Sequence, residues 1–454
     1  MSSEPRRAYG LSTGIYVVVA SMVGAGILTT SGYTLRETGN PWSLLALWAV
    51  GGLMALAGAL TIAEMATMLP RVGGDYLFAR EAFGPGTAIM VGWATFILGF
   101  AAPIAVIARL ATSYMLGDWL ALLPGPWPAI VEPGLAVILI AACACAHAFS
   151  HNHSASTQAT TTVIKLAILS GMVMAGLTLG TGSWAHFRVG GWPASTEWMP
   201  LASSLIYVSY AYAGWNGAAY LAGEIRDPGR LLPRALVGGC LLVTLLYLAM
   251  NTVYIFAIDP VAITAMSPGE VGRVAELAMT NLFGSGVARS ISVILGVGMV
   301  ASVSAYLMSG SRVVVAMAAD GAFFSMAGGW HPTRGTPIGA IVSLALVACI
   351  LACSGSFLQL LDYTSTGLTA VSALVVAGIF PLHQRLGRGV AFRMPLYPLP
   401  PLIVLGLSIW TITAVLMQEE KQIPALLSLA TIAVGVPLAG WLKKPAAHAP
   451  GIQE

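Results

Sequence analysis

The sequence predicts an all-α polytopic membrane protein with twelve transmembrane helices. Of its 454 residues, 57% are hydrophobic and only 9% are charged, whereas a soluble domain carries about a quarter charged residues. Apolar stretches of roughly twenty residues recur along the whole chain, and each is long enough to cross a bilayer core of about 30 Å. Two of these stretches are interrupted by closely spaced glycines, which indicates an internal repeat.

The apolar stretches set the expected spans. We place them at residues 10–38, 41–69, 84–116, 127–149, 156–180, 200–224, 233–257, 286–319, 337–354, 358–381, 397–417 and 423–442. The N-terminal "MSSEPRRAYG" does not look like a cleavable signal. It leads directly into the first long span, which would act as its own insertion signal.

Basic residues are distributed unevenly between the two sides of these spans. With the N-terminus inside, the cytoplasmic side holds Arg6, Arg7, Arg71, Arg80, Arg226, Arg230, Arg234, Arg312, Arg334, Arg385, Arg388, Arg393, Lys443 and Lys444. The outer side holds only Arg36, Arg188, Arg273, Arg289 and Lys421. Because positive residues accumulate on the cytoplasmic side, we expect a multi-pass protein of the cell (inner or plasma) membrane. Its N-terminus (1–9) and C-terminal tail (443–454) would both be cytoplasmic.

Glycines interrupt span one and span six. Span one contains Gly24-Ala25-Gly26, and span six contains "SYAYAGWNGAAYLAGE", in which Gly214 and Gly217 flank a tryptophan and an asparagine. Close helix packing is an alternative explanation for each glycine pair taken alone. It explains less well why both breaks occur at matching places.

Each interrupted span is the first of a block of five. Because five is odd, the second block must enter the membrane from the side opposite to the first. This arithmetic predicts an inverted repeat of residues 10–180 and 200–381, followed by two further helices in 382–442.

A helix break at membrane depth needs a partner for its freed backbone groups. N–H donors at the start of a half-helix suit a carboxylate, and carbonyls at the end of a half-helix suit an ammonium. Two breaks that face one another would therefore fit an α-amino acid, which carries both groups on one carbon.

Six ordered motifs resemble the amino acid–polyamine–organocation (APC) superfamily of transporters, most closely its L-amino-acid-transporter-like branch. They are "VGAGIL" (23–28), "LPRVGGDYLFAREAFG" (69–84), "SYAYAGWNGAAYLAGEIRDPGRLLPRAL" (209–236), "SGSRVVVAMAADGAFF" (309–324), "HPTRGTPIGA" (331–340) and "MPLYPLPPL" (394–402). The resemblance implies a LeuT-like fold of two inverted five-helix repeats.

The resemblance also implies a substrate site at the two breaks. The N–H groups of Gly24, Ala25 and Gly26 would bind the substrate carboxylate. In span six, carbonyls would receive the amino group, with an aromatic gate above the substrate. The expected carbonyl acceptors are those of Tyr210, Ala211 and Ala213. Tyr210 is also the expected gating residue, and Ile27 and Gly214 complete the expected site. Further contacts are predicted by position alone at Ile104, Ser304, Tyr306 and Thr366.

Lys165 lies about ten residues into span five, which is about 15 Å deep. A lysine there is costly unless it is paired or faces water, and its stem reaches only about 6 Å, too short to snorkel. In sodium-coupled members of the fold, a sodium ion lies near this place, and in sodium-independent relatives a lysine replaces it. The resemblance implies that Lys165 takes that role, with the carbonyls of Ala20 and Val23 and with Ser302 as partners. A lysine at this depth is also a candidate for releasing and regaining a proton during transport.

Four other polar residues in the spans have expected roles of their own. Arg109 would interact with lipid headgroups or line an outer vestibule as a gating residue. Glu64 is expected to act as an inner-gate or loop-anchoring charge. His147 is expected to make a satisfied polar contact, and Asn216 to satisfy backbone groups freed by the break.

The motif search favours no catalytic or metal site. The five cysteines all lie in apolar stretches, so no disulfide framework is implied. "SHNHS" (150–154) is expected to be a polar connection rather than a metal site, because no carboxylate or cysteine joins it. We therefore expect a chain that is not an enzyme and needs no metal and no cofactor.

The sequence thus predicts a sodium-independent secondary transporter of neutral L-amino acids, working by proton-coupled symport or exchange through alternating access. Its partners would be the substrate, the bilayer and protons, with no nucleic acid and no obligate protein partner. Alternatives are an antiporter of cationic amino acids or polyamines with the same fold, and a transporter-like nutrient sensor. Neutral cargo is favoured because no acidic residue is expected at midplane depth.

Overall fold

A computed structural model describes residues 9–71, 73–149, 155–190, 198–331, 334–387 and 389–441. Within these ranges the regular structure is helical. Nine helices are long and apolar enough to cross a membrane, or ten if a bent pair counts as one span. The chain is therefore a polytopic helical membrane protein, as the composition predicts.

The long helices follow the apolar stretches closely. They are α3 (Pro41–Met68), α5 (Pro85–Ala94) with α6 (Ala102–Ala121), α7 (Trp127–Phe149), α8 (Ala155–Leu179), α10 (Pro228–Ala257), α13 (Ser285–Ala319), α15 (Phe357–Ala377), α17 (Leu399–Leu416) and α18 (Glu419–Trp441). A π-helical segment, η1 (Thr95–Ala101), joins α5 to α6. Pro103 lies near the start of α6, directly after this π-helical segment. It has no backbone N–H to donate, so it cannot contribute a helical hydrogen bond there.

The first span is broken where the glycines predict it. α1 (Leu11–Met22) and α2 (Gly26–Thr38) meet at a bend of 46°. Residues 23–25 between them are not helical. The predicted interruption of span one is confirmed.

The sixth span is also broken, but its second half differs from the prediction. α9 (Trp198–Tyr212) ends before turns at 213–216, and a short 3₁₀ segment, η3 (Gly217–Leu221), follows. The predicted interruption of span six is therefore confirmed, but residues 217–224 beyond it are a 3₁₀ segment and turns, and the α-helix resumes only in α10. Gly214 has a φ of +97°, a backbone conformation that an α-helix cannot contain.

Two of the twelve expected spans stay predictions, because their helices are short. α9 and α14 (Ile338–Ala352) have 15 residues each, fewer than the roughly twenty that a bilayer core requires. Shorter helices connect the spans: α4 (Gly74–Phe83), η2 (Trp184–Arg188), η4 (Ala262–Ala265), α11 (Pro268–Val271), α12 (Val274–Phe283), η5 (Ser325–Ala327) and α16 (Ile379–Leu386).

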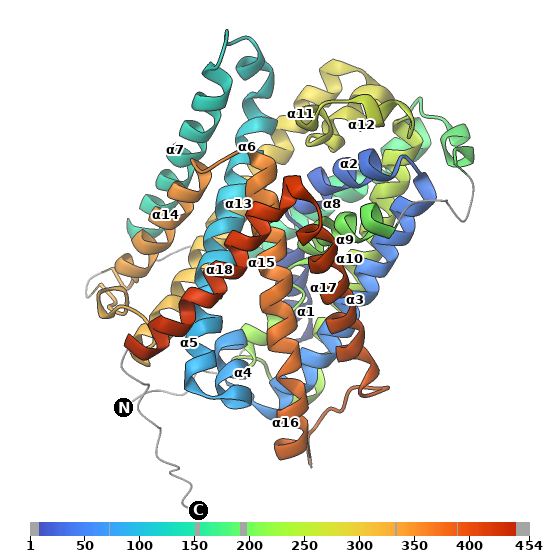
Figure 1. The fold of residues 1–454 in the computed structure, drawn as a ribbon. Coiled ribbons are helices and arrows are strands. Elements are labelled where there is room, and N and C mark those ends of the chain that lie inside the picture. The colour runs from blue at the N-terminus through green and yellow to red at the C-terminus, as the bar shows by residue number, and fades with distance from the viewer. Residues whose placement is uncertain are drawn as a thin grey trace, which may run out of the picture.

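The two ends of the bundle are built differently (Figure 1). At one end, α11 and α12 lie beside α2, and we call η4, α11 and α12 the cap and this side the cap end. At the other end lie α4 and α16, and we call it the terminal end. Among the described spans, the third (Pro85–Ala121) is the most enclosed, because 78% of its most apolar 18-residue stretch is buried. In α7 only 17% of the corresponding stretch is buried. α7 therefore belongs to the lipid-facing periphery, and the interior surrounds the two broken spans.

Candidate functional site

The two helix breaks lie directly against each other. A Cβ added to Gly26 would come within 2.4 Å of the Ala211 Cα, and one added to Gly214 would come within 2.6 Å of the Ser21 carbonyl oxygen. Both approaches are closer than a side chain permits. The glycines are therefore required for backbone of the two breaks to touch.

A tyrosine hydroxyl joins the two breaks. Tyr247, from α10, donates to the Met22 carbonyl at 2.7 Å and to the Ala211 carbonyl at 3.2 Å. Met22 is the last residue of α1, and Ala211 is the second-last residue of α9. The Tyr247 hydroxyl therefore satisfies carbonyls that lose their helical partners at the two breaks. Ala211, predicted to receive the substrate amino group, already accepts this hydrogen bond.

Two further tyrosines hold the first turn of α2. Tyr254 donates to the Ile27 carbonyl at 3.2 Å, and Tyr114 donates to the Leu28 carbonyl at 2.6 Å. Sequence reasoning missed all three tyrosines. A signal existed in α10, because Tyr247 and Tyr254 are seven residues apart in an apolar span and so share one helix face.

The N–H groups expected to bind a carboxylate are available. In the described part of the chain, no acceptor is found for the N–H groups of Gly24, Ala25 and Gly26. The N-terminus of α2 also has no side-chain cap. Three unpaired donors at the start of a 13-residue helix form a site suited to an anionic group.

Lys165 and Ser302 form the predicted pair. The Lys165 Nζ donates to the Ser302 Oγ at 2.6 Å, which links α8 to α13. Both residues line a cavity of about 30 Å³ together with Val23 and Gly24 of the first break. In the described residues, no hydrogen bond joins the ammonium to the carbonyls of Ala20 or Val23. Ser302 is therefore the observed partner, and the two carbonyls stay predictions.

Several residues that were predicted to contact the substrate have other surroundings in the structure. The Ser304 Oγ lies 2.6 Å from the His147 Nε2, so this hydroxyl joins α13 to α7 rather than standing free for a substrate. The same bond confirms that His147 makes a polar contact. Tyr210 is buried, and the Thr366 hydroxyl is buried with no hydrogen-bond partner in the described residues. Ile104, Tyr306 and Ala213 carry no feature that tests their predicted roles.

Arg109 is buried and ion-paired in this structure, and its predicted role at the headgroups or as a gate of the outer vestibule stays a prediction. The residue is 5% exposed. Its guanidinium donates to both Glu132 oxygens, at 3.2 and 2.8 Å, and to the Gly355 carbonyl at 3.2 Å. Sequence reasoning missed the pairing because Glu132 is 23 residues away on a different helix. Arg109 ties α6 to α7 and to the turn before α15.

Glu64 is an anchoring charge in this structure. It is fully buried, and it accepts from the His383 Nδ1 at 2.6 Å and from the Met394 backbone N–H at 2.8 Å. These bonds fix α16 and the segment before α17 on α3. Its predicted loop-anchoring function fits these contacts, and its gating role stays a prediction.

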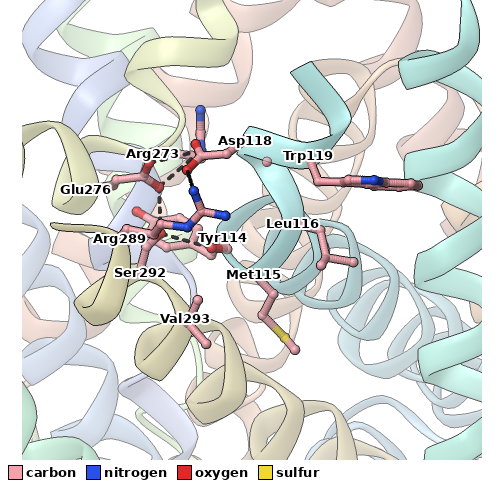
Figure 2. Close-up of a pocket in the computed structure, with 11 residues that line it drawn as sticks. Tyr114, Met115, Leu116, Asp118, Trp119, Arg273, Glu276, Arg289, Ser292 and Val293 are labelled. Atoms are coloured by element: carbon pink, nitrogen blue, oxygen red, sulfur yellow. Dashed lines mark hydrogen bonds and ion pairs between the residues drawn. The ribbon is translucent and has the colours of Figure 1, made fainter. Parts of the chain in front are cut away.

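A second cavity, of about 50 Å³, lies at the cap end away from both breaks. Figure 2 shows Arg273, Glu276 and Asp118 gathered at its rim, with Trp119 pointing away. Arg289 lies 3.2 Å from Asp118, and Arg273 lies 3.1 Å from Glu276. Each charge has a partner of opposite sign, so the cavity is an ion-paired seam between the cap, α6 and α13.

Comparison with known proteins identifies the chain. The family profile described as amino acid permease matches residues 9–436. The chain belongs to this family. The match includes both breaks, Lys165 and the cap.

Individual amino acid transporters resemble this permease over most of their length. The serine/threonine exchanger SteT of Bacillus subtilis (strain 168) is 26% identical over 442 residues, which is 97% of each chain. The b(0,+)-type amino acid transporter 1 of Mus musculus is 26% identical over 420 residues, covering 91% of this chain and 83% of its own. The Asc-type amino acid transporter 1 of Mus musculus is 25% identical over 459 residues, covering 97% and 82%. The family and these relatives are transporters rather than enzymes.

Proposed function

We propose that this permease is a sodium-independent secondary transporter of neutral L-amino acids that works by alternating access, by exchange or proton-coupled symport. The contact between the two breaks carries the proposal. Free N–H donors at the start of α2 suit the substrate carboxylate, and carbonyls at the end of α9 suit its amino group. The binding residues would be Gly24, Ala25, Gly26 and Ile27 in span one, with Tyr210, Ala211, Ala213 and Gly214 in span six.

Tyr247 binds the carbonyls at the two breaks. Its hydroxyl bonds to the Met22 and Ala211 carbonyls, so these two carbonyls at the breaks have a partner within the protein. A substrate ammonium would compete with this hydroxyl for the Ala211 carbonyl. Substrate binding would then loosen one link between α10 and the breaks and favour a rearrangement of the site.

Lys165 supports the sodium-independent part of the proposal. Its side chain lines the cavity beside the first break and its ammonium binds Ser302 of α13, so a positive charge already occupies the place between these elements. A sodium ion would be repelled from a place that an ammonium occupies. We propose that Lys165 couples closure of the site to substrate or to a proton.

The proposed architecture follows from the odd number of helices in each block. Residues 10–180 and 200–381 would be inverted repeats, α17 and α18 would follow within 382–442, and α9 and α14 would complete twelve spans. The distribution of arginine and lysine supports a cytoplasmic terminal end and an outward cap end.

Neutral cargo is supported by the cavity and by one relative. The residues that line the cavity beside the first break include Lys165 and no carboxylate, so a second positive charge on a substrate would be unfavourable there. The name of SteT describes exchange of serine and threonine, which are neutral amino acids. We propose this substrate class and an exchange mode for the present chain.

Counterflow into liposomes tests the proposal. Purified protein is reconstituted with unlabelled L-serine or L-alanine inside, and uptake of the labelled amino acid is followed with sodium or with choline as the external cation. We expect acceleration by internal substrate and equal rates with the two cations. Acceleration only by arginine or putrescine would replace neutral cargo with cationic cargo, and no acceleration by any of them would contradict transport.

Lys165→Met tests the coupling role, because it removes the charge and keeps much of the side-chain volume. We expect at least a tenfold loss of counterflow, with Lys165→Arg retaining more activity than Lys165→Met. Wild-type turnover in Lys165→Met, with an unchanged pH profile, would contradict the role.

A further inference from the structure

Two buried carboxylates outside the substrate site bind the two halves of the second broken span. Asp362 is 5% exposed and Asp75 is 8% exposed. Each accepts a hydrogen bond from a tyrosine hydroxyl, and the two tyrosines lie on opposite sides of the break at 213–216. The proposed transport mechanism gives no role to either carboxylate.

The first carboxylate lies at the cap end. The Tyr207 hydroxyl of α9 donates to the Asp362 Oδ1 of α15 at 2.6 Å. The Lys421 ammonium lies 4.9 Å from the centre of the Tyr207 ring and forms an ion pair with Glu37. The ion-pair partner of Lys421 is therefore Glu37, and the direct partner of Asp362 is a neutral hydroxyl. We call Tyr207 and Asp362 the cap latch.

The second carboxylate lies at the terminal end. The Tyr220 hydroxyl of η3 donates to the Asp75 Oδ2 at 3.0 Å, and the Asn216 Nδ2 donates to the Oδ1 at 3.0 Å. Asp75 is in the first turn of α4, where the helix dipole stabilises a negative charge. We call Tyr220, Asn216 and Asp75 the terminal latch.

The glycine before Asp75 is required by this contact. Gly74 has a φ of +50°, and a Cβ added there would come within 2.1 Å of the Tyr220 ring. The ring therefore packs directly on backbone and brings its hydroxyl to the carboxylate. The contact with Tyr220 thus explains why the second motif has a glycine at 74 directly before the aspartate at 75.

We propose that the cap latch and the terminal latch are reciprocal. Each holds one half of the broken sixth span against its carboxylate, and each opens only while the hydrogen bond of the other latch is intact. This inference rests on the proposed alternating access. The carboxylates belong to α15 and α4, which are not part of the broken spans. The unwound residues 213–216 lie between the two tyrosines, so one half can leave its carboxylate while the other half stays bound.

A hydroxyl–carboxylate bond suits a latch that must open repeatedly. A hydrogen bond to a charged group is stronger than a neutral one. Its opening exposes one charge to water, whereas opening a buried ion pair separates two charges. Losing one such bond shifts a two-state population by roughly tenfold or more.

Hydrogen–deuterium exchange in lipid nanodiscs tests reciprocity without a substrate. The variants are Tyr207→Phe and Tyr220→Phe, which remove one oxygen each. Tyr363→Phe is the matched control, because the Tyr363 hydroxyl bonds to Thr431 of α18, which is not one of the broken spans. Amide exchange is followed in α4 (residues 74–83) and in α11–α12 (residues 268–283).

Reciprocal latches give opposite patterns in the two variants. We expect Tyr220→Phe to raise exchange in α4 roughly tenfold and to lower it in α11–α12, and Tyr207→Phe to do the reverse. Tyr363→Phe should change neither segment. If each variant raises exchange only at its own end, or if neither differs from Tyr363→Phe, the latches are ordinary local contacts and the proposal is overturned.

A second pair of variants guards against misfolding. Asp75→Asn and Asp362→Asn keep the shape of the side chain and remove its charge, and they should reproduce the two opposite patterns. The exchange experiment can fail while wild-type counterflow succeeds, which would overturn the latches and leave transport intact. Failure of counterflow with opposite exchange patterns would overturn transport instead.

Discussion

The cap end and the terminal end hold their interior carboxylates by different means. At the cap end, carboxylates lie beside cations: Glu132 binds Arg109 and Glu37 binds Lys421. At the terminal end, Glu64 binds an imidazole and a backbone N–H, and Asp75 binds an amide and a hydroxyl. Apart from Asp362, whose direct partner is the Tyr207 hydroxyl, these cap-end carboxylates are paired with an arginine or a lysine, whereas Glu64 and Asp75 at the terminal end are not.

This difference determines which perturbation each end should resist. A buried ion pair resists moderate changes of pH but is damaged when one partner is neutralised, because the other charge is left unpaired. A buried carboxylate with neutral donors can take up a proton without leaving an unpaired cation. We therefore expect loss of charge to weaken the cap end most, and pH to affect the terminal end most.

The largest effect is expected for Arg109→Leu at the cap end. Glu132 would keep its charge in a poorly hydrated place, at a cost of about 3–5 kcal/mol in unfolding free energy. Urea or thermal unfolding in mixed micelles measures the loss. The double variant Arg109→Leu with Glu132→Leu should recover most of it, and a single variant as stable as the wild type would remove the contrast between the ends.

An intermediate effect is expected for Glu64→Gln at the terminal end. The amide keeps one acceptor but places an NH₂ group against either His383 or the Met394 N–H, at a cost of about 1–3 kcal/mol in unfolding free energy. The same unfolding experiment applies. Glu81→Gln is the control, since its pair with Arg71 spans 3.6 Å near the surface and contributes little.

A smaller and pH-dependent effect is expected at Asp75. Burial raises the pKa of this carboxyl above its ordinary value of 3.8, so the folded state binds its proton more tightly than the unfolded state does. Its contribution to stability therefore grows as the pH falls through the raised pKa and levels off below about 3.8. Stability measured against pH in wild type and Asp75→Asn should differ in slope over this range, and equal slopes would contradict it.

The smallest effect is expected for Asp118→Asn in the cap-end seam. Arg289 and Asp118 are 69% and 48% exposed, so their ion pair contributes at most about 1 kcal/mol. Salt should screen it further. Unfolding in low and high sodium chloride checks this, and a loss that persists at high salt would indicate a buried role for Asp118.

The broken spans show how far the sequence predicts the site. Glycines at 24, 26, 214 and 217 interrupt apolar runs, and both interruptions occur in the structure. The partners of the breaks were not predictable in this way. Tyr247 reaches Met22 across 225 positions of the chain, and no local pattern indicates which carbonyl a tyrosine in an apolar span will bind.

Charged residues show the same contrast between what the sequence predicts and what only the tertiary structure reveals. The sequence identifies Lys165 as a charge at membrane depth, and Ser302 was predicted as its partner only through a family resemblance. Arg109 was expected to interact with headgroups or to line the outer vestibule. Its pairing with Glu132 was not predicted, because Glu132 is 23 residues away on another helix.

The sequence by itself determined the spans, their interruptions and the membrane as solvent, because these depend on local hydrophobicity and on backbone freedom near each residue. Tertiary structure alone decided which hydroxyls satisfy the broken backbone, which carboxylates hold the two halves of span six, and which ions are paired. Those choices are contacts between residues far apart in the chain. They are fixed by how the helices pack, and packing depends on all the surfaces that meet at once.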